Sequence, residues 1–449
     1  MSNIATAFSI MLSISAALQA AESGERTCNN WPQWRGPTHN GVAPLGDPPI
    51  RWSQTENLQW KSPIAGRGHS TPIIWDEQIF LVTAIPIKKS LSASYTVPAG
   101  TARISEHDAV ITKWTPQALV LICLDRQTGQ ERWRRTVHEV MPHQGYHWKG
   151  SFASASPVTN GKHVFVYFGS YGLFCFDMKG QLAWKRQLGP QAMEDSLGEG
   201  SSPALFGNTL VVVVDHELQS FILAIDSRTG QTLWKQNRNE VSNWSTPRIF
   251  EHAGIHQVVV NGEFVRSYDL ANGNLLWQCG GQSEGAIPIP AVGHGMVFAT
   301  SGYARDTFHA IRLGKQGDLT DSKHVIWSLN RGTPYVPSPM LWKNEIYLLE
   351  DRSFFSCLQA TDGTQHYLKH RLPGILNFSA SPVGAADRIY LLSEEGTTVV
   401  LKRGIHPELL SINQIDETFY ASPAIVGDSI YLRGDKHLYR FSKSTNPPR

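Results

Sequence analysis

Charge is scarce in this chain of 449 residues. Charged side chains make up 17% of it, and 40 Lys and Arg nearly balance 38 Asp and Glu. A chain so nearly neutral presents no dominant basic surface, which argues against nucleic acid as its partner. It also lacks the high net charge that keeps a chain disordered.

Cysteine is scarce as well, with five residues in the whole chain. They stand singly, with no CxxC, no CxxCH and no two adjacent cysteines. This pattern argues against a disulfide framework, a zinc site and a c-type haem. Cys123, Cys175 and Cys357 lie in apolar, strand-like runs. We therefore expect them to be small buried hydrophobic residues.

Recognisable catalytic motifs are also missing. The chain has no HExxH, no GxSxG elbow and no phosphate-binding loop. Three histidines in the loop 138–148 stand at spacings of five and four, which is not a tight metal motif. The adjacent acids at 194–195 and 394–395 are expected to be solvated turn residues. We predict no catalytic residue and no metal site.

The N-terminal apolar run is short. Ile4–Ala20 is uncharged and mostly apolar, and it ends at the small residues Ala20 and Ala21. Its length suits a cleaved secretory signal better than a membrane span, although an uncleaved anchor stays open. We predict a signal peptide at 1–20, a periplasmic or secreted location and no membrane span after its removal.

Glycine, proline and tryptophan are abundant, at 38, 26 and 14 residues. Gly and Pro weaken helix interiors, so the composition excludes a coiled coil and a helical solenoid. It favours many short strands joined by many turns.

An internal repeat organises these residues. Eight prolines each precede an apolar strand-like run, and seven of them follow Ser or Thr. They are Pro72, Pro157, Pro203, Pro247, Pro290, Pro339, Pro382 and Pro423. From Pro157 to Pro423 the interval averages about 44 residues, the length of a four-stranded propeller blade.

A turn glycine followed four residues later by an aromatic residue keeps phase with the prolines. Gly129, Gly180, Gly230 and Gly273 are each followed at that spacing by Trp, and Gly363 by Tyr. The glycine suits a positive φ, and the aromatic ring would cover the seam between neighbouring sheets. The predicted blade-docking residues are Trp60, Trp133, Trp184, Trp234, Trp277 and Tyr367.

The two ends of the repeat complement each other. The last repeat stops at Phe441 without a Trp turn, and residues 57–61 resemble an orphan outer strand. We therefore predict an all-β fold, an eight-bladed β-propeller of four-stranded antiparallel blades closed by an N-terminal strand. Seven blades is the alternative. The propeller would span 51–442 with an insertion at about 85–117, between an extension at 21–50 and a tail at 443–449.

Loops leading into the innermost strands of a propeller surround the mouth of its channel. Their charged, amide and aromatic side chains are candidates for a ligand site. These residues are Arg67, His69, Trp148, Lys149, Glu199, Asn243, Trp244, Glu284, Tyr335, Asn377 and Tyr420.

The turn-plus-Trp repeat resembles the pyrroloquinoline-quinone-like (PQQ-like) propeller repeats shared by quinone-dependent alcohol dehydrogenases and BamB-like proteins. The runs WPQWRGP at 31–37, GHSTP at 68–72, FGSYG at 168–172 and PYVPSP at 334–339 are similar to BamB-like propellers of planctomycete bacteria. The dehydrogenases pair vicinal cysteines over the quinone and carry a calcium set and a catalytic Asp. This chain has no Cys-Cys pair, and none of those positions can be matched.

The resemblance therefore favours an exported, non-catalytic scaffold or ligand-binding propeller, possibly in envelope assembly. Its expected partner is another envelope or secreted protein, and the chain is expected to be a monomer without a cofactor. One alternative is an oxidoreductase that uses pyrroloquinoline quinone with calcium. A carbohydrate-binding or carbohydrate-cleaving propeller, suggested by the aromatic mouth, is the other.

Overall fold

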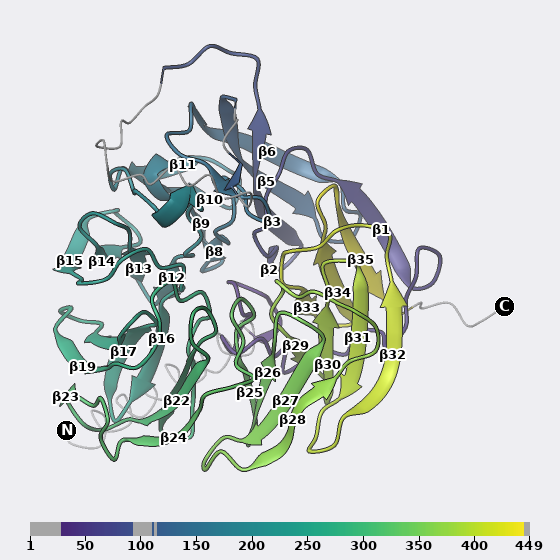
Figure 1. Cartoon of the computed structure of the whole chain (residues 1–449). Helices are drawn as coiled ribbons and strands as arrows, with labels where there is room; N and C mark the ends of the chain where they lie inside the picture. Colours follow the sequence, from purple (N-terminus) through teal and green to yellow (C-terminus); the bar gives the residue numbers. More distant parts are fainter. Residues whose placement is uncertain (1–27, 93–109, 112–114, 444–449) are drawn as a thin grey trace, which may run out of the picture.

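The computed structural model describes residues 28–92, 110–111 and 115–443. Eight four-stranded antiparallel sheets stand around a central channel, one of them with a fifth strand, and a separate two-stranded sheet lies outside them (Figure 1). The prediction of an all-β, eight-bladed propeller is confirmed. The predicted signal peptide and most of the insertion lie outside the described residues.

The first four blades follow the chain from the inside of the ring outward. Blade 1 contains β2 (Ile73–Trp75), β3 (Gln78–Pro86), β5 (Gln117–Asp125) and β6 (Glu131–Val140). Blade 2 contains β8 (Val158–Thr159), β9 (His163–Tyr167), β10 (Leu173–Asp177) and β11 (Leu182–Arg186). Blade 3 contains β12 (Ala204–Phe206), β13 (Thr209–Val214), β14 (Phe221–Asp226) and β15 (Thr232–Asn237). Blade 4 contains β16 (Arg248–His252), β17 (Ile255–Val260), β18 (Val265–Asp269) and β19 (Leu275–Cys279), and β23 (Gly317–Asp318) extends it in parallel.

The next three blades repeat this order, and the last one draws a strand from the start of the propeller. Blade 5 contains β20 (Ala291–Gly293), β21 (Met296–Ser301), β22 (Thr307–Arg312) and β24 (Val325–Leu329). Blade 6 contains β25 (Met340–Trp342), β26 (Glu345–Leu349), β27 (Phe354–Gln359) and β28 (Gln365–Arg371). Blade 7 contains β29 (Val383–Ala385), β30 (Arg388–Leu392), β31 (Thr397–Lys402) and β32 (Glu408–Gln414). Blade 8 contains β33 (Ala424–Val426), β34 (Ser429–Arg433), β35 (His437–Ser442) and β1 (Leu58–Pro63).

Three smaller elements lie in connections. β4 (Val110–Ile111) pairs with β7 (Tyr146–His147), which ties the insertion between β3 and β5 to the loop after blade 1. The 3₁₀ turns η1 (Gly169–Tyr171) and η2 (Glu194–Ser196) lie in loops of blade 2.

Every innermost strand begins at the residue after a repeat proline. Proline lacks an N–H donor, so it suits the first position of a strand. We call the end of the channel where these strands begin the mouth and the opposite end the base.

The residues before these prolines form a ring of hydrogen bonds around the channel, here called the hydroxyl ring. The backbone N–H of one residue donates to the hydroxyl of the residue at the same position in the next blade. The six bonds are Thr71 to Ser156 (3.0 Å), Ser156 to Ser202 (2.9 Å), Ser202 to Thr246 (3.0 Å), Ile289 to Ser338 (3.1 Å), Ser338 to Ser381 (2.9 Å) and Ser381 to Ser422 (3.0 Å). The Thr71 hydroxyl donates to the Ser422 carbonyl at 3.1 Å. Ile289 has no hydroxyl, so the link between blades 4 and 5 is missing.

The outer turns join neighbouring blades. Gly129, Gly180, Gly230, Gly273 and Gly363 have φ values of 71°, 77°, 75°, 77° and 75°. A Cβ on any of them would collide with a tryptophan of the preceding blade. In chain order these tryptophans are Trp60, Trp133, Trp184, Trp234 and Trp327. Only glycine therefore combines the turn with the close ring contact.

Blade 5 departs from this pattern. Its turn is lengthened by residues 314–324, so Trp327 stands outside the glycine-plus-four spacing, and the sequence analysis missed it. Trp277 of blade 4 pairs in register with Gly317 of β23, and its Nε1 donates to Gln257 at 3.2 Å within its own blade. The extra residues 314–324 explain both the shifted position of Trp327 and the different contacts of Trp277.

The ring closes where β1 pairs antiparallel with β35. Trp60 of β1 packs over Gly129 of blade 1, and its Nε1 donates to the Arg126 carbonyl at 3.1 Å. Closure therefore uses the same ring contact as the other blade junctions.

The N-terminal segment crosses the base of the channel. Trp31 forms a bridge with Ile74 of blade 1, and Val42 with Gly384 of blade 7. The Thr159 N–H donates to Pro32 O at 2.9 Å. We call residues 31–47 the base strap, because they contact blades 1, 2, 4 and 7 across the base.

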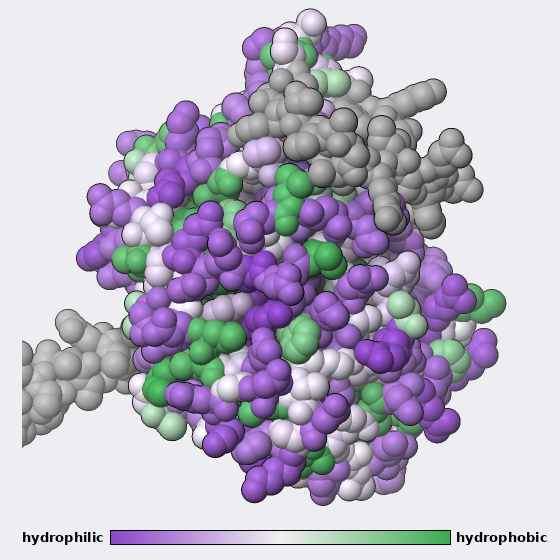
Figure 2. Space-filling model, turned by 60° about the vertical axis from the view of Figure 1, so that its left-hand side comes forward, coloured by the Kyte–Doolittle hydropathy of each residue, from purple (hydrophilic) through white to green (hydrophobic). Residues whose placement is uncertain are grey.

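The face shown in Figure 2 is largely hydrophilic, with separate hydrophobic patches. Cys123, Cys175 and Cys357 are buried, as expected, and so is Cys279; all four are free. Within the described residues, no helix has the length and apolar character needed to cross a membrane.

Candidate functional site

The channel contains a cavity of about 290 Å³. Residues from the mouth loops of all eight blades line it, together with Trp34 of the base strap. Its aromatic lining consists of Trp34, His69, His147, Trp244, Tyr335 and Tyr420. Hydroxyls of the hydroxyl ring form much of its remaining wall, so the cavity combines ring faces with small polar groups.

Trp34 forms the end of the cavity toward the base. Its backbone lies in the base strap, and its Nε1 donates to Ser422 Oγ of the hydroxyl ring at 3.4 Å. The strap thus places an indole inside the channel, at the end of the cavity that faces the base.

Lys149 brings a positive charge to the wall, but a carboxylate already pairs with it. Its Nζ lies 2.8 Å from Glu394 Oε2, and the Ser379 hydroxyl donates to Glu394 Oε1 at 2.6 Å. The Glu394 side chain is 11% exposed, which corrects the expectation that the acids at 394–395 are solvated. Glu395 accepts from the Asn377 side chain at 2.7 Å.

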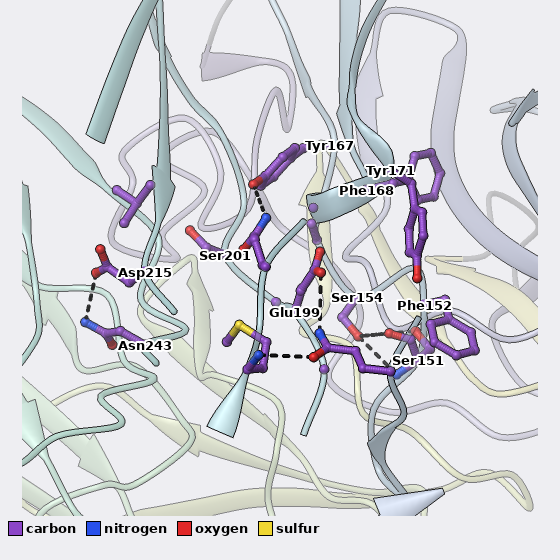
Figure 3. A pocket seen from close by; sticks show the side chains of 18 of the residues that line it. Ser151, Phe152, Ser154, Tyr167, Phe168, Tyr171, Glu199, Ser201, Asp215 and Asn243 are labelled. Atoms are coloured by element: carbon purple, nitrogen blue, oxygen red, sulfur yellow. Dashed lines mark hydrogen bonds between the residues drawn. The ribbon is translucent and has the colours of Figure 1, made fainter. Parts of the chain in front are cut away.

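Glu199 is a wall carboxylate held by neutral donors (Figure 3). Its Oε2 accepts from the Ser170 N–H at 2.7 Å, and its Oε1 from the Ser170 hydroxyl at 2.5 Å and Gln144 Nε2 at 3.5 Å. Gly169 has φ of 53°, and a Cβ there would overlap the Glu199 carboxylate. The FGSYG run therefore builds the tight turn η1 around this side chain. Burial raises the pKa of Glu199 to about 7.

A second, small cavity of about 30 Å³ adjoins the first at Glu199. Tyr167, Gln144 and Asn243 are among its lining residues, several of which Figure 3 shows around the carboxylate. A polar space of this size can hold a water molecule. Glu199 thus faces both the open channel and a water-sized chamber.

His69 and Tyr420 form one side of the mouth. Their rings lie 4.7 Å apart, and His69 Nε2 is 3.5 Å from Asp435 Oδ1. Burial lowers the pKa of His69, which keeps the imidazole neutral at pH 7.

Tyr335 lines the mouth from the loop that leads into blade 6. Its ring stacks on Tyr303 with centroids 5.3 Å apart. Asp351 accepts from the N–H groups of Tyr335 at 3.2 Å and Val336 at 3.1 Å, and burial raises its pKa. This carboxylate thus orients the loop that carries the Tyr335 ring.

Six of the eleven predicted mouth residues meet in the channel cavity. They are His69, Lys149, Glu199, Trp244, Tyr335 and Tyr420. Asn243 lines the small cavity and donates to the Asn261 carbonyl at 2.6 Å. Arg67 donates to the Trp148 carbonyl, while Glu284 is exposed and Asn377 contacts Glu395. Four predicted residues therefore lie outside the lining of both cavities, namely Arg67, Trp148, Glu284 and Asn377.

The sequence analysis missed Trp34, Asp351 and Glu394 as parts of the site. Both acids follow the second strand of a blade by two residues, and Asp435 stands at the same position in blade 8. That repeated position is a signal the sequence carries. The sequence carries no comparable signal for Trp34, because only the path of the base strap brings this residue into the channel.

Metal binding has no support from side-chain clustering. Among the described residues, no three His, Cys, Asp or Glu side chains converge as a metal site would require. His143 of the histidine-rich loop contacts the Tyr171 hydroxyl at 2.9 Å and Gln191 O at 2.9 Å.

The fold and its channel define a PQQ-like β-propeller. The chain belongs to the family described as outer membrane protein assembly factor BamB, whose model matches residues 117–366. No curated protein sequence matches this chain at a significant level.

Solved structures share the fold at low sequence identity. BamB from Moraxella catarrhalis is 11% identical with a TM-score of 0.51, covering 81% of this chain and 99% of its own. Quinohemoprotein alcohol dehydrogenase ADHIIG from Pseudomonas putida HK5 is 10% identical with a TM-score of 0.60, covering 95% and 83%. The quinohemoprotein alcohol dehydrogenase from Comamonas testosteroni is 11% identical with a TM-score of 0.57, covering 96% and 85%. At this identity they indicate the fold alone.

Proposed function

We propose that this protein is an exported, non-catalytic binding protein of the cell envelope that holds another envelope or secreted protein over the mouth of its channel. The observation that carries the proposal is the aromatic cavity at the mouth. Loops from eight blades build it on a rigid ring, and Trp34 closes it from the base. A concave apolar pocket with a few polar groups is typical of a recognition site.

The charged groups of the pocket support binding over catalysis. Lys149 is neutralised by Glu394, and Glu394 also accepts from Ser379. Asp351 orients the Tyr335 loop. These side chains hold the mouth in one shape, which reduces the entropy lost when a partner binds.

The residues do not fit a pyrroloquinoline quinone. This cofactor carries three carboxylates, so its pocket must supply cations or a metal. The one lysine of the wall, Lys149, is already paired with Glu394, and among the described residues no three acidic, His or Cys side chains converge to hold Ca²⁺. We expect neither a shift in melting temperature nor a change in tryptophan fluorescence when the quinone and Ca²⁺ are added. A saturable shift would favour the oxidoreductase.

Site-specific photo-cross-linking tests the binding face. A photoreactive amino acid replaces Trp148 or Ile375, which are 43% and 86% exposed in mouth loops. The control position is Leu45 in the base strap, which is 51% exposed. We expect the same partner protein to be cross-linked from both mouth positions, and excess unlabelled protein to displace it.

Three outcomes would contradict the proposal. They are cross-linking only from Leu45, no cross-linking from either mouth position, and saturable binding of a glycan in the absence of any protein partner. The last result would favour the carbohydrate-binding alternative.

A further inference from the structure

The channel cavity combines aromatic walls with a carboxylate that no cation among the described residues contacts. Trp34, Trp244, Tyr335 and Tyr420 present rings to the space. Glu199 shares that wall, and its three bonds come from a backbone N–H, a hydroxyl and an amide. A cation placed among aromatic faces is attracted by their π electrons, and a carboxylate adds to this attraction.

The surrounding charges favour the same ligand chemistry. Asp351 and Glu394 lie close enough to the tyrosine rings of the mouth to act on them electrostatically, Asp351 on Tyr335 and Glu394 on Tyr420. Lys149 pairs with Glu394 and also acts electrostatically on Asp351, whereas no cation among the described residues contacts Glu199. Three carboxylates of the mouth, Glu199, Asp351 and Glu394, thus stand beside one ammonium, Lys149, and this part of the wall is locally negative when they are ionised.

The positive groups of the rim are already engaged. Arg67 donates to the Trp148 carbonyl and lies 5.7 Å from the centre of the Tyr146 ring. Lys149 lies 5.1 Å from the centre of the Trp148 ring. These contacts leave the Glu199 carboxylate available to a cation that comes from outside the chain.

We propose that the cavity receives an arginine or lysine side chain from an extended segment of the protein partner, with its cationic head between the aromatic rings and Glu199. This inference rests on the proposed function, because it names the group by which the partner enters the mouth. The local negative charge selects a basic segment over an acidic one. The depth of the pocket down to Trp34 accommodates a long side chain better than a short one.

The test uses three peptides with the full chain: Ac-Gly-Ser-Arg-Ser-Gly-NH₂ and its Gln and Glu counterparts. Binding is followed by calorimetry and by the total tryptophan fluorescence, to which Trp34 and Trp244 contribute from the cavity. We expect the Arg peptide to bind about tenfold more tightly than the Gln peptide, with affinity falling as salt rises. The Glu peptide should not bind measurably.

Variants assign the effect to the site. Glu199→Gln should lower affinity for the Arg peptide about tenfold, whereas Glu199→Asp keeps the charge and should retain more of it. The matched control is Glu408→Gln on the outer surface, where Glu408 pairs with Lys402 at 2.9 Å, and it should leave affinity unchanged. Melting temperatures confirm that each variant is folded.

Equal affinity for the Arg and Gln peptides would overturn the inference, and so would wild-type affinity in Glu199→Gln. Binding of spermidine without binding of the Arg peptide would also overturn the inference. It would indicate that the cavity binds a free polyamine and not a protein segment. Failure of the proposed function would be a different result, namely the absence of any partner cross-linked from the mouth. A partner cross-linked at the mouth but not displaced by the Arg peptide would retain the function and remove this inference.

Discussion

The indole of Trp327 lies over Gly363 of the next blade, and its Nε1 donates to the Ala360 carbonyl at 2.9 Å. Trp60, Trp184 and Trp234 make the same kind of bond to turn carbonyls, at 3.1, 2.9 and 2.8 Å. Each indole therefore fills the space between two blades and satisfies its own polar group there. The junctions are independent copies of one contact, so each can be tested alone.

Removal of one junction indole should destabilise the ring. Trp327→Ala leaves a cavity above Gly363 and is expected to lower the free energy of unfolding by about 3–5 kcal/mol. Urea denaturation measures the change. The control is Trp148→Ala at the exposed mouth, which should change stability by less than about 0.5 kcal/mol. Equal losses in the two variants would contradict the role assigned to the junction.

Gly169 should tolerate no side chain, because the Glu199 carboxylate occupies that space. Gly207 is the matched control, since its φ of 55° is close to the 53° of Gly169 and nothing lies within 4 Å of its Cβ position. Gly207→Ala is expected to cost about 1 kcal/mol through backbone strain alone. Gly169→Ala should cost clearly more and also weaken Arg-peptide binding. Similar costs in urea denaturation would show that the carboxylate does not pack against η1.

Glu199 should make stability depend on pH. Burial raises its folded-state pKa from 4.5 to about 7, and its hydrogen-bond donors, Ser170 and Gln144, are neutral. A carboxyl with a raised pKa contributes stability that is complete below pH 4.5 and is lost as pH rises to about 7. Glu199→Gln should therefore gain relative to the wild type across this window. Parallel stability curves for the two proteins would contradict the assignment.

Two arginines at the base lack acidic partners within the described residues. Arg35 donates to Pro382 O at 2.8 Å and Arg248 to Thr38 O at 3.2 Å, and burial lowers the pKa of each to about 9. Replacement of a poorly compensated buried charge by an apolar residue is often stabilising, so Arg248→Met should raise stability by about 1–3 kcal/mol.

The matched control for Arg248→Met is Arg388→Met. Arg388 also contacts the base strap, but it pairs there with the half-exposed Asp47. Its replacement should lower stability by up to about 1 kcal/mol. Destabilisation by Arg248→Met in thermal or urea unfolding would show that its carbonyl contacts outweigh the cost of burying the charge.

The ring could be predicted from the sequence because each blade carries its own local signals. Pro72 and its seven counterparts precede strands, and glycines such as Gly129 form the outer turns, all within about 44 residues. Trp327 shows the limit of this approach, since an insertion of a few residues moved it out of the spacing that identified the other tryptophans.

The site could be predicted only in part, because its contacts join distant blades. Lys149 and Glu394 are 245 residues apart in the sequence, and neither position indicates the other. The pairing depends on where two loops lie around the ring. The position of Trp34 depends on the path of the base strap, which no repeat encodes.

The pairing of β1 with β35 also sets an order of events in folding. One partner lies near the start of the propeller and the other in its last repeat, so blade 8 cannot be completed until both are available. Contacts between such distant residues form late, because the loop that joins them must close first. We therefore expect the seven other blades to form a partly assembled arc whose two end blades each leave one sheet face uncovered. That intermediate would be the form of the protein most exposed to aggregation through its apolar faces, until the completed blade 8 packs between the two end blades.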